Sequence, residues 1–150
     1  MDKVDATSSR VARLIPNQDV YEGAEKVPGP IMEALKKTFE LYKELAERLG
    51  SISAQYELGR CYKFGLGVGK DEDLAFFWMQ KTANQGNMFA QASLGFDYSL
   101  GTGVKQDMRK AVFWLQKAGA QGHLLALEHL ENEKFQNYFN EVKNNSYKDG

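Results

Sequence analysis

The chain has 150 residues, of which 43% are hydrophobic and 26% charged, and this is the composition of one ordinary globular domain that can bury its own core. Its 19 basic residues stand against 20 acidic ones, with no basic stripe in the sequence, which argues against a nucleic-acid-binding surface. The only cysteine, Cys61, excludes an intramolecular disulfide and favours a reducing compartment.

Residues 1–30 are expected to form an N-terminal arm that is partly extended. Pro16, Pro28 and Pro30 interrupt regular structure, yet the segment carries too many apolar side chains for a plain linker. We expect a short helix near 8–15, followed by an extended stretch that lies against the rest of the chain. Because neither a signal-peptide core nor a run of about 20 apolar residues occurs, we expect a cytoplasmic protein without a membrane span.

A helix is predicted over residues 31–49, because apolar side chains recur there with a period of 3.6 residues. Pro30 suits its start, since proline is tolerated in the first helical turn. The predicted apolar stripe consists of Ile31, Leu35, Thr38, Phe39, Tyr42, Leu45, Ala46 and Leu49. We interpret residues 31–51 as a degenerate unit that closes one end of a helix stack.

The central part of the chain is a tandem repeat. When residues 52–86 are aligned with residues 88–122, a shift of 36, sixteen positions hold identical residues without a gap, against about two expected between unrelated segments. The coinciding pairs include Leu58 with Leu94, Gly59 with Gly95, Tyr62 with Tyr98, Phe77 with Phe113, Trp78 with Trp114 and Gly86 with Gly122. This period predicts repeated helix pairs, with units at 52–87 and 88–123.

Each unit is predicted to contain a helix, a glycine turn and a second helix. The buried faces expected in the first unit are Ala54, Leu58, Cys61 and Tyr62 on the first helix, and Ala75, Trp78, Met79 and Thr82 on the second. A glycine inside the first helix, Gly59 and then Gly95, indicates that two helix backbones approach closely. Asp71 and Asp107 are placed as N-caps of the second helices. The predicted helices span 53–64, 73–85, 89–100 and 109–121.

After the second repeat the pattern decays into a closing helix, predicted over residues 124–142. Glu131 replaces the glycine of the repeat, and the expected inner face consists of Phe135, Tyr138, Phe139 and Val142. Residues 143–150 are predicted to form a polar tail. Degenerate ends are typical of the capping units at the termini of a repeat stack, which argues against a fragment of a longer array.

Both units resemble the Sel1-like repeat. The first unit carries the resemblance in Ala-Gln-Tyr-Glu-Leu-Gly-x-x-Tyr-x-x-Gly-x-Gly-Val at 54–68 and in Ala-x-x-Trp-Met-x-Lys-x-Ala-x-Gln-Gly at 75–86. The resemblance implies an all-α fold, an α/α superhelical solenoid of antiparallel helix pairs related to the tetratricopeptide repeat. It also implies a role in bacteria as an adaptor for signalling or secretion-related complexes, or as an immunity protein that neutralises a co-encoded toxin.

The sequence offers no candidate catalytic residues, and we expect no enzyme activity, cofactor or metal. A subgroup of relatives linked to penicillin binding has a disulfide-bonded cysteine pair in each helix hairpin. Here Cys61 has no second cysteine to pair with, and the equivalent position of the second repeat is Asp97. The glycine-rich turn ending at Lys70 follows a predicted helix rather than a strand, which argues against a phosphate loop. His123 and His129 are not spaced as metal ligands on one helix face, and His123 is expected to form surface hydrogen bonds.

The resemblance implies that the first helices of successive units line one concave groove, where a partner protein binds. The expected partner-binding residues are Glu57, Arg60, Lys63, Phe64, Ser93, Phe96, Asp97 and Leu100, and Ser99 is also expected to face outward. Phe96 stands where the other unit has Arg60. It is either an exposed apolar anchor for the partner or a side chain covered by the closing helix or the N-terminal arm.

The sequence therefore favours a non-enzymatic protein-binding module, with the roles of regulatory adaptor and immunity protein both left open. The alternative from a different class is a cell-wall or β-lactam hydrolase, which is disfavoured because the cysteine pairs and a catalytic constellation are missing from the sequence. No nucleic-acid or membrane partner is expected.

Overall fold

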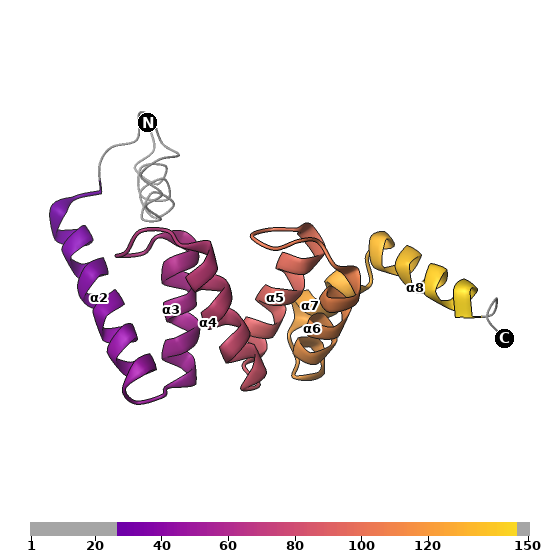
Figure 1. The fold of residues 1–150 in the computed structure, drawn as a ribbon, viewed down its shortest axis with the longest axis horizontal. Coiled ribbons are helices and arrows are strands. Elements are labelled where there is room, and N and C mark those ends of the chain that lie inside the picture. The colour runs from indigo at the N-terminus through magenta and orange to yellow at the C-terminus, as the bar shows by residue number, and fades with distance from the viewer. Residues whose placement is uncertain (1–26, 147–150) are drawn as a thin grey trace, which may run out of the picture. The chain divides into compact units, whose positions relative to one another are not determined.

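The computed structural model describes residues 27–146, and within them the chain forms seven helices and no strand (Figure 1). The helices are α2 (Gly29–Glu47), α3 (Ile52–Phe64), α4 (Glu72–Asn84), α5 (Met88–Leu100), α6 (Met108–Ala120), α7 (Leu124–Leu130) and α8 (Glu133–Ser146). The chain divides into two compact units, Met1–Trp78 and Met79–Gly150, with the boundary inside α4. The short helix predicted near residues 8–15 lies outside the described residues.

In the first unit α2 lies beside α3 (Figure 1), and both contribute to a core with Trp78, in the middle of α4. The buried cluster consists of Phe39, Ala46, Ala54, Leu58, Cys61 and Trp78, which confirms the predicted buried face of α3. The rings of Phe39 and Tyr62 meet edge-on, with 5.5 Å between their centroids. The helix α2 begins two residues earlier than predicted, and Pro30 lies in its first turn as expected.

The turn between α3 and α4 needs a glycine at Gly67 for two reasons. Its φ of +72° lies in the left-handed region, and a Cβ atom at this position would collide with the backbone carbonyl of Leu35 in α2. The N–H of Asp71 then donates to the carbonyl of Tyr62 at 2.9 Å, which fixes the end of the turn. The repeated glycine turn is therefore a packing element as well as a reversal of the chain.

Helix caps recur with the period of the repeat. Ser51, Asn87 and His123 occupy equivalent positions, and each side chain accepts a hydrogen bond from the backbone N–H three residues later. For His123 the acceptor is Nδ1, at 3.2 Å. The surface hydrogen bonding expected of His123 is thus that of an N-cap. Asp71 and Asp107 cap the second helices as predicted.

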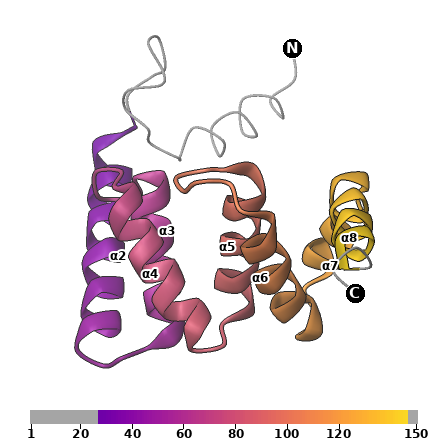
Figure 2. The ribbon, with the colours of Figure 1, turned by 45° about the vertical axis from the view of Figure 1, so that its right-hand side comes forward.

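In the second unit α5 packs against α6, and α6 packs against α7 (Figure 2). A Cβ atom added to Gly95 would lie 2.5 Å from Cγ and 3.1 Å from the backbone nitrogen of Leu115. The close approach of helix backbones predicted from the recurring glycine is therefore confirmed at α5 and α6. Gly119 of α6 meets Leu127 of α7 in a similar way, because an added Cβ would lie 2.5 Å from Cδ2.

Repeated glutamines form a hydrogen-bond network in the second unit. The buried Gln91 donates from Nε2 to the carbonyl of Ala83 at 3.1 Å, and its Oε1 accepts from Nε2 of Gln121 at 2.8 Å. The same Nε2 atom of Gln121 lies 2.9 Å from the carbonyl oxygen of Gly86. These contacts satisfy the side-chain amide of Gln91, since buried polar side chains require hydrogen-bond partners.

The prediction of a single closing helix over residues 124–142 is wrong, because the segment forms two helices, α7 and α8. Helix α7 ends at Leu130, and Asn132 caps α8 by accepting a hydrogen bond from the N–H of Phe135 at 3.3 Å. Glu131, which stands where the repeat has its glycine, is the C-cap of α7. Helix α8 continues to Ser146, past the predicted end.

Three side chains predicted to be buried, Thr38, Leu49 and Val142, are exposed. The hydroxyl of Thr38 donates to the carbonyl of Ala34 at 2.8 Å, so it turns back onto its own helix. Leu49 lies beyond the end of α2, and Val142 lies in the distal half of α8. Phe135 alone of the predicted inner face of α8 is fully buried among the described residues.

Candidate partner-binding surface

The outward column of α3 combines an ion pair with an exposed aromatic ring. Glu57, Arg60 and Phe64 lie three and four residues apart and therefore share one helix face. Nη1 of Arg60 lies 3.0 Å from Oε2 of Glu57. Phe64 is 40% exposed at the last residue of the helix, and Lys63 beside it is partly exposed. The column thus presents charge and apolar surface on one rigid element.

The outward column of α5 has the same spacing and consists of Ser93, Phe96, Asp97 and Leu100. The first three of these side chains are half-buried, whereas Leu100 is 67% exposed. Leu100 is the repeat equivalent of Phe64, so the first helix of both repeats ends in an exposed apolar side chain. The recurrence of an exposed apolar side chain at the same position of both repeats makes these two residues candidate contacts for a partner.

Phe96 is covered on one side by α7. Its ring meets the imidazole of His129 edge-on, with 5.0 Å between the ring centroids and an interplanar angle of 84°. The imidazole of His123 lies 6.4 Å away. The sequence left open whether Phe96 is exposed or is covered by the closing segment. In the structure α7 covers one side of the ring, and the side chain as a whole is half-buried.

The expectation that Ser99 faces outward is wrong, because the residue is 1% exposed. Its Oγ atom donates to the carbonyl of Phe96 at 2.9 Å and lies 3.2 Å from Nε2 of His129. Its own carbonyl accepts hydrogen bonds from Lys134 and Gln106, both at 2.7 Å. Ser99 therefore lies on the side of α5 that meets α7 and the first turn of α8.

The surroundings of the His129 imidazole favour its neutral form. Burial lowers its pKa, and the ammonium group of Lys134 lowers the pKa further. Nδ1 of His129 lies 3.4 Å from Nδ2 of Asn132, which is a donor and therefore matches an unprotonated nitrogen. The histidine thus joins α5 to the junction between α7 and α8.

A serine beside a histidine resembles the start of a catalytic pair, and the sequence did not predict this contact. The hydroxyl hydrogen of Ser99 is held by the carbonyl of Phe96, and the residue is closed to solvent, so no substrate can approach its oxygen. The geometry therefore assigns Ser99 and His129 to the packing of the second unit.

The thiol of Cys61 is buried and poorly reactive. Burial raises the pKa of Cys61 to about 11, the carboxylate of Glu57 raises the pKa in the same direction, and Arg60 opposes both. The thiol is therefore protonated at neutral pH, which is the form with low nucleophilicity.

In residues 27–146 no group of three or more His, Cys, Asp or Glu residues is arranged to hold a metal ion. Lys70 of the glycine-rich turn pairs with Glu72 at 3.0 Å.

One exposed column, on the second helices, was not included among the predicted binding residues. Phe77 and Phe113 occupy equivalent positions and are 52% and 49% exposed. Each ring meets the following tryptophan edge-on, at 5.2 Å for Trp78 and 4.9 Å for Trp114. Both tryptophans are buried, as predicted for core residues. The coincidence of the two phenylalanines in the self-comparison was the signal that could have found this column.

Comparison with known proteins identifies the repeats. The family described as Sel1 repeat matches residues 52–87 and 89–123. A Sel1 repeat protein from Oxalobacter formigenes matches with a TM-score of 0.58 and 32% identity, over 81% of this chain and 45% of that protein. A protective antigen present in uropathogenic Escherichia coli strains, which displays an SLR fold, matches with a TM-score of 0.57 and 30% identity, over 67% and 24%. The chain therefore contains two Sel1 repeats and has the predicted all-α fold of Sel1-like repeat proteins.

Sel1 repeat proteins generally mediate protein–protein interactions and are generally non-catalytic scaffolds. This chain spans less than half of the Oxalobacter formigenes protein and about a quarter of the Escherichia coli antigen. No curated protein matches it significantly. Among the described helices, none has the length and apolar character needed to cross a membrane.

Proposed function

We propose that this chain is a non-enzymatic module that binds a partner protein through the outward columns of α3 and α5. The observation that carries the proposal is the pair Phe64 and Leu100, two exposed apolar side chains at equivalent positions of two repeats. Burying such a side chain against a partner contributes about 1–3 kcal/mol. Charged and polar neighbours surround each of them, as in a binding surface with an apolar centre and a polar rim.

The polar neighbours give the columns their specificity. On α3 the ion pair of Glu57 and Arg60 is exposed enough to exchange its partners when another charged surface arrives. On α5 the side chains of Ser93 and Asp97 flank the half-buried ring of Phe96. Each column therefore places polar or charged side chains beside an apolar one, which suits a protein segment better than a small apolar ligand.

We propose further that the partner is either a signalling protein, with this chain as a regulatory adaptor, or a co-encoded toxin, with this chain as an immunity protein. Both solved relatives named above come from bacteria, and the buried lone thiol suits a reducing cytoplasm. Expression of the adjacent gene with and without this chain distinguishes the roles, because only an immunity protein restores growth to cells that make the toxin.

The proposal is tested by affinity capture of a partner from the source bacterium, followed by the same capture with the Phe64→Ala, Leu100→Ala double variant. We expect one dominant protein to be retained by the wild type and lost from the double variant. A partner that the double variant retains fully would contradict the assignment of these columns. Turnover of a β-lactam or of cell-wall fragments by the purified chain would favour the hydrolase alternative instead.

A further inference from the structure

The exposed side of α6 is a basic surface. We call five of its exposed side chains the basic face of α6, namely Arg109, Lys110, Phe113, Gln116 and Lys117. These residues share one side of the helix, while Ala111, Trp114, Leu115 and Ala118 on the other side are buried. Helix α6 contains no acidic residue, and the next acidic residue along the chain is Glu128. The face thus concentrates positive charge in a chain whose net charge is −1.

Most of this charge is not neutralised within the described part of the chain. Lys110 lies at 4.0 Å from Oδ2 of Asp107, the acidic N-cap of α6, while Oδ1 accepts a hydrogen bond from a backbone N–H. No ion pair to Arg109 occurs among the described residues. The ammonium group of Lys117 lies over the ring of Phe113, 4.8 Å from its centroid. The ammonium group of Lys110 also lies 5.2 Å from the centroid of the Tyr98 ring. Arg109 without an ion pair and Lys110 with a long one can therefore both bind a carboxylate beside the half-exposed ring of Phe113.

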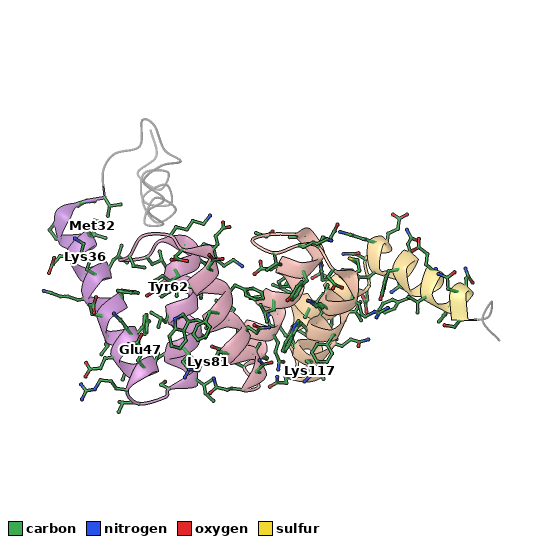
Figure 3. All side chains as sticks on the ribbon, in the orientation of Figure 1. Met32, Lys36, Glu47, Tyr62, Lys81 and Lys117 are labelled. Carbon is green, nitrogen blue, oxygen red and sulfur yellow. The ribbon has the colours of Figure 1, made fainter. Side chains whose placement is uncertain are left out.

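The other repeat provides an internal comparison for this surface. The positions of α4 equivalent to Arg109 and Lys110 hold Asp73 and Leu74, whereas Phe77 matches Phe113 and Lys81 matches Lys117. Lys81 and Lys117 are both labelled in Figure 3. The aromatic packing on tryptophan is common to both repeats, so the fold explains the phenylalanines. The fold does not require the cations, because α4 forms the same helix with an acidic residue and a leucine.

We infer that the basic face of α6 is a second docking site, which takes an acidic segment of a partner protein that also carries an apolar side chain. Carboxylates of the segment complement Arg109 and Lys110, and its apolar side chain covers the exposed half of the Phe113 ring. The basic face of α6 shares no residue with the outward columns of α3 and α5. A nucleic acid fits less well, since three cations would neutralise only about three phosphates.

The test uses the full chain and a short fluorescent peptide of glutamate and leucine, with fluorescence anisotropy at low and at physiological salt. The variant Arg109→Asp, Lys110→Leu gives α6 the residues that α4 has, so the helix is expected to form normally. A matched control, Lys36→Asp, Lys37→Leu, makes the same change of net charge on α2. We expect the α6 variant to bind the peptide roughly tenfold more weakly at low salt, and the α2 control to bind as the wild type does.

A second peptide, in which glutamine replaces every glutamate, is expected not to bind. The inference is overturned if the glutamate peptide does not bind the wild type, or if it binds both variants equally. A labelled single-stranded oligonucleotide that binds more tightly than the peptide would assign the face to a nucleic acid. Sedimentation of a dimer that only the α6 variant disrupts would assign it to a second copy of the chain. The Phe64→Ala, Leu100→Ala variant is expected to bind the peptide normally, so failure here is distinct from failure of the proposed function.

Discussion

Nε2 of His129, on α7, lies 3.2 Å from Oγ of Ser99, on α5. Because the serine hydroxyl donates its hydrogen to the carbonyl of Phe96, its oxygen accepts here and Nε2 carries the imidazole hydrogen. Nδ1 then accepts from the side-chain amide of Asn132 at 3.4 Å. The neutral tautomer therefore satisfies both nitrogens, and a proton added to Nδ1 would face an amide donor beside the ammonium group of Lys134.

This contact predicts that the protein is less stable in mild acid. The folded state lowers the pKa of His129 below its usual value of 6.5, so the unfolded chain binds the proton first. The stabilisation is complete above pH 6.5 and is lost as the pH falls through that value toward the pKa of the folded state. Urea unfolding in buffers above and below this range measures the loss. His129→Gln should reduce the dependence on pH, because glutamine does not titrate in this range. A dependence on pH that this substitution leaves unchanged would contradict the role given to His129.

Gly95→Ala is expected to destabilise the protein by about 1–3 kcal/mol, although alanine favours an isolated helix. The new methyl group would press on the backbone nitrogen of Leu115, which cannot move without shifting α6. Thermal unfolding measures the change. The control is Gly69→Ala, because no atom lies within 4 Å of a Cβ there and its φ is not in the left-handed region. Equal stabilities for the two variants would mean that α5 and α6 are not as close as described.

Trp114→Ala is expected to cost about 3–5 kcal/mol, because its side chain is buried against the core of the second unit. Phe113→Ala, at the neighbouring and half-exposed position, should cost clearly less. Denaturant unfolding of both variants gives the comparison. A near-neutral Trp114→Ala would show that the core of this repeat is misassigned.

Most of the repeat architecture could be predicted from the sequence, since its determinants recur at fixed spacing. Gly95, Trp114 and the cap Asp107 each coincide with a residue of the other repeat, and each has the expected role. The break between α7 and α8 was missed because the apolar periodicity runs on through it. The local signal was Asn132, an N-cap residue three positions before a buried phenylalanine.

The surface was harder to predict than the fold. Whether Ser99 and Phe96 face outward depends on α7, whose histidine comes 30 residues after the serine, and no local pattern fixes such a contact. The balanced composition likewise hid the basic face of α6, because a net charge of −1 says nothing of how the charges are distributed over helices. Equivalent positions of the two repeats, compared by charge rather than by identity, would have revealed it.

Arg60→Glu is expected to slow association with the captured partner by roughly tenfold at low salt, with a smaller effect at high salt. The change reverses a half-exposed charge and replaces its attraction to Glu57 with repulsion. Stopped-flow or surface-based kinetics measures the rate. Lys81→Glu, on the second helix of the same repeat, is the control and should leave the rate unchanged. An association rate insensitive to Arg60 would exclude it from the encounter surface.

The most direct test of the partner-binding columns is calorimetric titration of the captured partner into three forms of the chain. These are the wild type, the Phe64→Ala, Leu100→Ala double variant, and Leu41→Ala, which removes a comparably exposed apolar side chain from α2. All three are expected to unfold at nearly the same temperature, because the substituted side chains are exposed. We predict that the double variant weakens binding by about 2–4 kcal/mol and that Leu41→Ala binds as the wild type does. Equal affinity of the double variant and the wild type, or a loss confined to Leu41→Ala, would contradict the proposal that the first helices of the repeats hold the partner.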